Sequence, residues 1–301
     1  MEPVWQWGIN VIHTIQLMHG PALDAIMKAI TSMGNEEFFL ILLPLVFWCV
    51  DLAVGARLAF AFLLSTYVNT GLKHLFAHPR PFELDSTVQL YDAEGYGLPS
   101  GHSQSAVVVW GVIAASLRKA WLWAVAILLM ILIGFSRVYL GVHFPTDVLC
   151  GWAVGAIFLA VYLVFEPRIE AWLKQASLVA QLSLAVVVPL ALLLLYPTKD
   201  TTSPMAVLMG MGVGVTLTRQ MISFSAAGPL WQRSVRFLVG AIVLIVLYVG
   251  LKLVFPAEGE PLYLVMRTVR YGLMGLWAAL GAPWLFLRLR LASSEVEKVE
   301  A

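Results

Sequence analysis

Apolar runs long enough to cross a membrane dominate this chain and limit what it can fold into. They occupy about residues 36–54, 57–76, 101–118, 120–140, 147–166, 177–196, 204–224, 234–255 and 263–289. Each has roughly 17 to 27 residues, and about 20 residues of helix span about 30 Å of hydrocarbon. Of the 301 residues, 60% are hydrophobic and only 12% are charged, more apolar surface than a soluble fold could bury. The sequence therefore predicts an all-α, polytopic transmembrane helical bundle with roughly nine spans.

The remaining composition excludes several classes of protein. A net charge of +1 gives no basis for a nucleic-acid partner. The two cysteines, Cys49 and Cys150, fall in separate apolar runs, so neither a disulfide nor a cysteine metal site is expected. Because the first 30 residues lack a basic start and a long apolar core, we expect no cleavable signal peptide.

The few basic and imidazole side chains gather at the ends of apolar runs, in three motifs. The first is Lys73-x6-Arg80-Pro81. Prolines on both sides stiffen the backbone around Arg80, and a guanidinium held in this way offers a planar fork of donors to phosphate oxygens. The alternative is that Lys73 and Arg80 only anchor the protein to lipid headgroups, as basic residues commonly do at a membrane surface.

The second motif, Pro99-Ser100-Gly101-His102, opens an apolar run. Ser100 is a good helix N-cap, Gly101 lets an anion approach the backbone, and the free N–H groups of a helix start favour a phosphate. His102 would then lie in the first turn, beside the bound group. The alternative is a capped turn that carries an interfacial histidine.

The third motif, Ser136-Arg137-x5-His143-x3-Asp147, is the most specific of the three. Arg137 lies near the end of a predicted membrane helix, where a charge is costly without a partner. Thr146 can cap the next helix, which leaves Asp147 in its first turn. A carboxylate there can accept a hydrogen bond from one nitrogen of His143 and expose the other nitrogen for attack. The alternative is a structural His–Asp pair that ties two helices together.

Together the motifs supply three cations, two histidines and one carboxylate, a set that can hold a phosphate dianion and transfer its phosphoryl group. The combination of His102, His143 and Asp147 could also bind a metal ion. Three nearby cations would repel a divalent ion, so we expect neither a metal nor a cofactor. His74 and His78 flank the first motif, and we interpret them as interfacial side chains.

In order and spacing, the three motifs resemble those of the type-2 phosphatidic acid phosphatase superfamily. The members of this superfamily are integral membrane lipid phosphatases. The family pattern is Lys-x6-Arg-Pro, then Pro-Ser-Gly-His, then Ser-Arg-x5-His-x3-Asp, and this chain meets it over residues 73–147. A weaker similarity joins the segment that begins Met33-Gly-Asn-Glu-Glu-Phe-Phe to the sphingosine-phosphate phosphatase branch.

The resemblance implies a role for each motif residue. His143 would attack phosphorus and form a phosphohistidine, Asp147 would orient His143, and His102 would protonate the leaving oxygen and then activate water. The phosphoryl oxygens would be bound by Lys73, Arg80, Ser100, Gly101 and Arg137.

Together these expectations predict an enzyme that removes a terminal phosphate, without a metal ion, from a lipid phosphate or an isoprenoid pyrophosphate such as undecaprenyl pyrophosphate. The partners are then the lipid phosphate substrate and the surrounding membrane lipids, and the sequence leaves the oligomeric state open. Two alternatives stay open. The same site could pass the phosphoryl group to an acceptor, as a lipid phosphotransferase does, or the protein could transport a phospholipid without hydrolysis. A vanadate-dependent oxidant enzyme is a third and weaker alternative.

We predict four segments along the chain. Residues 1–34 form interfacial or membrane-dipping helices broken at Gly20-Pro21, with an ordinary spanning helix as the alternative, and residues 35–196 form the catalytic transmembrane core. Residues 197–291 form additional C-terminal transmembrane helices, and residues 292–301 form a polar tail. Lysine and arginine are more numerous in the loops opposite the motifs, which predicts that the motifs lie outside the cytoplasm. In a bacterium this would be the periplasmic or extracytoplasmic side of the inner (cell) membrane.

Overall fold

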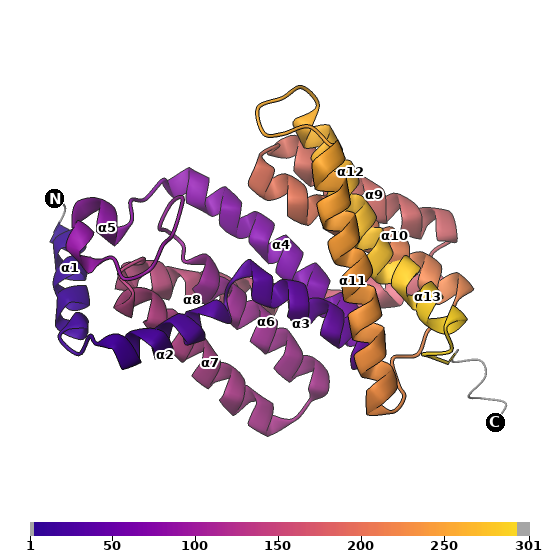
Figure 1. Cartoon of the computed structure of the whole chain (residues 1–301), viewed down its shortest axis with the longest axis horizontal. Coiled ribbons are helices and arrows are strands. Elements are labelled where there is room, and N and C mark those ends of the chain that lie inside the picture. Colours follow the sequence, from indigo (N-terminus) through magenta and orange to yellow (C-terminus); the bar gives the residue numbers. More distant parts are fainter. Residues whose placement is uncertain (1–2, 294–301) are drawn as a thin grey trace. The chain divides into compact units, whose positions relative to one another are not determined.

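The computed structural model describes residues 3–293, and this part consists of helices joined by turns and links, with no β-strand (Figure 1). The all-α prediction is confirmed, and every predicted apolar run is helical. The runs form α3 (Glu36–Cys49), α4 (Leu52–Phe76), α6 (Gly101–Leu117), α7 (Ala120–Tyr139), α8 (Pro145–Gln175), α9 (Leu178–Leu195), α10 (Lys199–Met221), α11 (Leu230–Val254), and a last helix of three parts, α12 (Tyr263–Leu276), η2 (Trp277–Gly281) and α13 (Ala282–Arg288). Most of the predicted polar tail, from residue 294 on, lies outside the described residues.

Fewer helices than predicted are long and apolar enough to cross a membrane. Among residues 3–293, five pass by length and composition, or up to six if the bent pair of α2 (Pro21–Ser32) and α3 counts as one span. The expected nine are not reached because α3 has 14 residues and α6 has 17, because α10 begins with the polar sequence Lys-Asp-Thr-Thr-Ser, and because Arg267 and Arg270 interrupt the start of the last helix. The chain is nevertheless an integral membrane protein, since these spans are strongly apolar.

The contacts divide the chain into two compact units. Unit 1 comprises Met1–Leu40 and Val68–Phe165, and unit 2 comprises Ile41–Tyr67 and Glu166–Ala301. The N-terminal helices α1 (Pro3–Gln16) and α2 therefore belong to the same unit as all three motifs. The sequence-based boundaries at residues 34, 196 and 291 stay a prediction.

Unit 1 is held together around the end of α7. Helices α6 and α7 pack side by side after a tight turn at Arg118, which has a left-handed backbone. From α1, Ile12 is fully buried, and the side-chain amide of Gln16 donates to the backbone carbonyls of Val88 and Tyr139, both at 2.8 Å. The short helices α5 (Pro81–Leu84) and η1 (Ser86–Val88) complete this region. The long polar link between α4 and α6 is thereby fixed against α1 and α7.

Unit 2 packs its helices through small residues. A Cβ atom on Gly210 of α10 would lie 2.0 Å from the carbonyl oxygen of Gly272 in α12, and one on Gly275 would lie 2.3 Å from that of Val207. Such small residues let membrane helices approach at backbone distance. Trp48, fully buried, donates its indole N–H to the carbonyl of Ala278 at 2.8 Å.

Candidate active site

The third motif forms a rigid corner between α7 and α8. Gly141 has a φ of +69°, and a Cβ atom there would lie 1.9 Å from the carbonyl oxygen of Val88, so only glycine fits the link. Asp147, in the first turn of α8, accepts the backbone N–H of Phe144 at 3.0 Å through Oδ2. The carboxylate thus caps its own helix, as an acidic residue at the third helical position can. Thr146 was predicted to be the cap, and this is wrong: it lies inside the first turn with its hydroxyl buried and unbonded.

The hydrogen bonds of His143 determine which of its nitrogens carries the proton. Arg80 Nη1 lies 3.2 Å from His143 Nε2, and a guanidinium can only donate, so Nε2 is the unprotonated nitrogen. His143 Nδ1 lies 3.3 Å from Asp147 Oδ2 and carries the hydrogen toward the carboxylate. Burial, reinforced by the charges of Arg80 and Arg137 against the opposing effect of Asp147, lowers the pKa of His143 to about 3. The imidazole is therefore neutral at physiological pH, with the lone pair of Nε2 directed at a cation.

Arg80 is held in place by backbone oxygens. It is only 4% exposed, and it precedes α5 between two prolines. Its Nε donates to the carbonyl of Gly95 at 2.7 Å, its Nη2 to that of Glu94 at 2.6 Å, and its Nη1 to that of Val142 at 2.9 Å. These contacts fix the plane of the guanidinium, so the charge is already positioned before an anion arrives.

The second motif leaves the start of α6 open. Ser100 is the N-cap residue, as predicted, but its side chain caps no backbone N–H. Its Oγ instead accepts a hydrogen bond from Ser103 at 3.1 Å, and its backbone N–H donates to the carbonyl of Asp147 at 3.0 Å. The amides of the first turn, which include that of Gly101, lack partners within the helix and form a place for an anion.

His102 and Arg137 are joined by a network that begins in the N-terminal segment. His102 Nε2 lies 2.8 Å from the side-chain oxygen of Asn35, and the amide nitrogen of Asn35 donates to the hydroxyl of Tyr91 at 3.2 Å. The guanidinium of Arg137 stacks over the ring of Tyr91 at 5.5 Å and donates through Nη1 to the Thr31 hydroxyl at 2.7 Å. Arg137 is 2% exposed, and its Nε has no hydrogen-bond partner, so donor capacity remains for an anion.

All eight predicted site residues therefore belong to unit 1. Lys73, near the C-terminal end of α4, donates to the carbonyl of Tyr96 at 2.9 Å. His102 is close enough to interact electrostatically with Lys73, Arg80, Arg137 and His143. The positive charges and the two imidazoles from three distant stretches thus share one region.

Sequence reasoning missed His78. It was interpreted as an interfacial side chain, but its Nδ1 lies 3.4 Å from Asp147 Oδ1, on the side of the carboxylate opposite His143. Trp5 Nε1 donates to His78 Nε2 at 2.6 Å, and an indole can only donate, so Nδ1 of a neutral His78 carries the hydrogen toward Asp147. No local pattern marks this role, because Trp5 and His78 are 73 residues apart.

Asn35 was also missed as a site residue, although the sequence carried a signal for it. It lies in the Met33–Glu37 stretch that resembles the sphingosine-phosphate phosphatase branch. In the same stretch, a Cβ atom on Gly34 would lie 2.5 Å from the ring of His102. The similarity therefore marks a segment that packs directly against His102.

The structure also bears on two other possible sites. Among residues 3–293, no group of three or more histidine, cysteine, aspartate or glutamate side chains is arranged to hold a metal ion.

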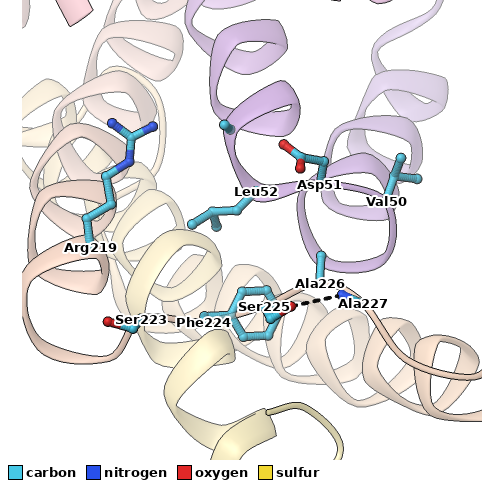
Figure 2. A pocket seen from close by; sticks show the side chains of 10 residues that line it. Val50, Asp51, Leu52, Arg219, Ser223, Phe224, Ser225, Ala226 and Ala227 are labelled. Atoms are coloured by element: carbon cyan, nitrogen blue, oxygen red, sulfur yellow. Dashed lines mark hydrogen bonds between the residues drawn. The ribbon is translucent and has the colours of Figure 1, made fainter. Parts of the chain in front are cut away.

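An open cavity of about 340 Å³ lies in unit 2, between the start of α4 and the link after α10 (Figure 2). None of the eight motif residues lines it, and Asp51 at its edge is used to cap α4 through the N–H of Val54 at 2.8 Å.

Comparison with known proteins identifies the class to which this fold and site belong. Residues 54–170 match the PAP2 superfamily, and residues 202–294 match the transmembrane extension of PAP2 superfamily phosphatases. The first match contains all three motifs. This chain belongs to the PAP2 superfamily, and the resemblance inferred from the motifs is confirmed.

Individual relatives are similar over part of their length. Lipid phosphate phosphatase delta of Arabidopsis thaliana is 27% identical over 244 residues, which are 73% of this chain and only 58% of that protein. The undecaprenyl-diphosphatase of Sulfolobus acidocaldarius is 29% identical over 163 residues, 52% of this chain and 78% of that protein. The crystal structure of a transmembrane PAP2-type phosphatidylglycerolphosphate phosphatase from Bacillus subtilis is 28% identical, with a TM-score of 0.50 over 56% of this chain and 89% of that one.

Proposed function

We propose that this protein is a membrane-embedded phosphatase that removes the terminal phosphate of a lipid phosphate or lipid pyrophosphate through a phosphohistidine, without a metal ion. The observation that carries the proposal is the arrangement of His143. Its Nε2 is unprotonated, 3.2 Å from the Arg80 guanidinium, while its Nδ1 faces the carboxylate of Asp147. A nucleophile directed at a fixed cation is what attack on a bound phosphate requires.

In the first step, the lone pair of His143 Nε2 forms a bond to phosphorus, and the bond between phosphorus and the lipid oxygen breaks. Arg80, Arg137 and Lys73 stabilise the charge on the phosphoryl oxygens, and Ser100 and the Gly101 amide add hydrogen bonds to them. The imidazole becomes positively charged as the bond forms, and Asp147 stabilises this charge.

His102 handles the proton in both steps. Its Nε2–H is held by Asn35, so Nδ1 is the nitrogen that moves the proton. Because burial and the nearby cations disfavour a charged ring in the free enzyme, Nδ1 takes a proton from the phosphate monoanion as it binds and gives it to the leaving lipid oxygen. In the second step, the same nitrogen takes a proton from water, and the water oxygen attacks phosphorus. The bond between phosphorus and His143 Nε2 breaks, inorganic phosphate leaves with the proton held by His102, and both histidines return to their neutral starting state.

Two residues outside the motifs act as positioning residues in this mechanism. His78, oriented by Trp5, supports the outer oxygen of Asp147, so that Oδ2 stays on the His143 side. Asn35 fixes the ring of His102 and links it through Tyr91 to Arg137. Such outer contacts keep catalytic groups within the narrow geometry that phosphoryl transfer needs.

The substrate is a lipid whose hydrophobic chain stays in the bilayer. The relatives named above act, by their names, on a lipid phosphate, on undecaprenyl diphosphate and on phosphatidylglycerol phosphate, which supports this class of substrate. Within the class we favour an isoprenoid pyrophosphate, and we place the site on the extracytoplasmic side of a bacterial cell membrane because of the distribution of lysine and arginine.

Phosphate release from a panel of prenyl, glycerol and sphingoid lipid phosphates tests the proposal. The purified protein, in detergent with excess chelator, should release phosphate from at least one of them and form an acid-labile, base-stable phosphoenzyme. His143→Ala and Arg137→Ala should abolish both signals while the protein still inserts and purifies. A strict need for a divalent ion would refute the metal-free mechanism, and wild-type rates in either variant would refute the site. Release that depends on an added acceptor lipid would indicate a phosphotransferase instead.

A further inference from the structure

The last helix of the chain carries two arginines shortly after it begins. In α12, Arg267 and Arg270 follow the first residue, Tyr263, by about one and two turns. Arg267 is well satisfied: its Nε donates to the Ser203 hydroxyl at 2.9 Å, and its Nη1 donates to the Tyr263 hydroxyl at 2.7 Å. Arg270, by contrast, makes no comparable contacts.

Arg270 is a buried cation for which residues 3–293 supply no hydrogen-bond acceptor. It is 7% exposed, and its Nε is buried with no hydrogen-bond partner. Its guanidinium carbon lies 4.9 Å from the centre of the Tyr271 ring and 5.5 Å from that of Tyr248 on α11. Among residues 3–293, no carboxylate forms an ion pair with it. Aromatic faces attract a cation but accept none of the in-plane N–H bonds of a guanidinium, so the site lacks an anion.

Of the carboxylates at this end of unit 2, Asp200 is exposed at the start of α10 and forms no ion pair with Arg270 among the described residues, and the other two are engaged elsewhere. Glu258 pairs with Lys199 at 3.2 Å, and Glu260 accepts the backbone N–H of Ala257 at 3.0 Å. A buried arginine in a membrane protein is costly unless an anion or a set of oxygens compensates it. Arg236 shows the usual solution in this chain, since three backbone carbonyls accept its hydrogen bonds. Within residues 3–293, Arg270 has no such set of oxygens, which points to an acceptor that binds as a ligand.

The surroundings of Arg270 identify the kind of anion. Arg270 is the seventh residue after Tyr263, the first residue of α12, which is a depth of about 10 Å along the helix. The neighbouring positions Val265, Val269 and Leu273 are 53%, 43% and 41% exposed, as expected of side chains that face lipid. Tyrosines are enriched where hydrocarbon meets headgroups. An anion that reaches a guanidinium at this depth, beside exposed apolar side chains, is most simply the phosphate of a lipid.

We propose that Arg270, framed by Tyr248 and Tyr271 and flanked by Arg267, binds the phosphate of an anionic phospholipid headgroup. The site belongs to unit 2, in the segment that matches the transmembrane extension, and none of the eight motif residues contributes to it. It gives the C-terminal helices a function in addition to packing: they hold a specific lipid as a ligand that is not hydrolysed. The guanidinium fork suits a phosphodiester, which has two free oxygens.

Native mass spectrometry of the full chain in detergent tests this proposal. Delipidated protein is titrated with phosphatidylglycerol, with phosphatidylcholine and with inorganic phosphate. We expect retention of phosphatidylglycerol in preference to phosphatidylcholine, and Arg270→Gln should weaken that binding by about tenfold or more, the effect of losing a charged bidentate donor. Arg288→Gln is the matched control, because Arg288 also stacks on an aromatic ring, that of Trp284 at 5.5 Å, but is exposed.

Several results would overturn the proposal. Equal binding by wild type and Arg270→Gln would do so, as would an equal loss in Arg288→Gln, which would indicate a general effect of charge. Displacement of the lipid by millimolar inorganic phosphate would assign the site to a soluble anion. Loss of the bound lipid in Arg137→Gln but not in Arg270→Gln would place it at the active site. If Arg270→Gln does not fold, the melting temperature of the wild type provides the test. It should rise more with phosphatidylglycerol than with phosphatidylcholine, and equal rises would overturn the proposal.

Discussion

Replacing Asp147 by asparagine tests the arrangement of the active site most directly. Asp147 Oδ2 receives two N–H groups, from His143 Nδ1 at 3.3 Å and from the Phe144 backbone at 3.0 Å. Oδ1 faces His78 Nδ1 at 3.4 Å. In Asp147→Asn the amide oxygen can occupy only one of these positions. With the oxygen on the His143 side, the new NH₂ group faces the N–H of His78, and the negative charge is gone.

The expected loss follows from the bond that disappears. In the proposed mechanism, the ring of His143 becomes a cation when it attacks phosphorus, and its Nδ1–H is then bonded to a carboxylate. A hydrogen bond to a charged group contributes about 1.5–3 kcal/mol. Since each 1.36 kcal/mol of barrier is a factor of ten, kcat should fall by about ten- to 150-fold. The KM should change little, because the phosphate is bound by other residues.

A rapid-quench, single-turnover assay with a radiolabelled lipid phosphate separates phosphoenzyme formation from phosphate release. Asp147→Asn should slow the first of these steps. The matched control is Asp51→Asn, which removes an exposed carboxylate that caps α4 in unit 2 and should leave both rates unchanged. Wild-type kcat in Asp147→Asn would refute the assigned role, and a rise in KM alone would mean that Asp147 acts in binding.

His78 extends this test, because it is argued to act only through Asp147. His78→Gln removes a 3.4 Å contact that falls short of a full hydrogen bond, so the loss in kcat should be about twofold, corresponding to about 0.5 kcal/mol. In the Asp147→Asn background the same substitution should have almost no further effect. Independent, additive losses would show that His78 acts by another route.

Two further predictions concern stability. Burial lowers the pKa of His143 to about 3, whereas the same side chain in the unfolded chain takes up a proton near pH 6.5. The free energy of unfolding therefore has its full value above pH 6.5 and falls by about 1.4 kcal/mol per pH unit between pH 6.5 and 3. When the pH is lowered from 7.5 to 5, thermal unfolding in detergent should show that the free energy of unfolding of wild type falls by about 2 kcal/mol more than that of His143→Gln. Equal decreases in the two proteins would contradict the neutral state assigned to buried His143. Gly141→Ala should destabilise by at least about 2 kcal/mol, whereas Gly95→Ala, also at positive φ but with nothing within 4 Å of an added Cβ, should lose only about 1 kcal/mol. Equal melting temperatures for these two variants would refute the close contact between Gly141 and Val88.

The helices and the main site residues could be predicted from the sequence because both are encoded locally. Apolar runs of membrane length form helices wherever they lie in the chain, since backbone hydrogen bonds must be satisfied within the segment. The spacing Arg137-x5-His143-x3-Asp147 places His143, the proposed nucleophile, in a link and the carboxylate in the first turn of the next helix, whatever the rest of the fold does. The detail of Thr146 as the cap was wrong, because α8 begins at Pro145, which places Thr146 inside the first turn.

The sequence by itself thus determined the membrane class, the family and the eight side chains of the proposed site. Only the tertiary structure decided which residues support them and where a second anion could bind. Trp5 reaches His78 across 73 residues, and Asn35 reaches His102 across 67. The packing around Arg270 leaves its Nε without an acceptor among residues 3–293. These roles have no local pattern, since a hydrogen bond between distant residues depends on how helices pack and not on the spacing of neighbours along the chain.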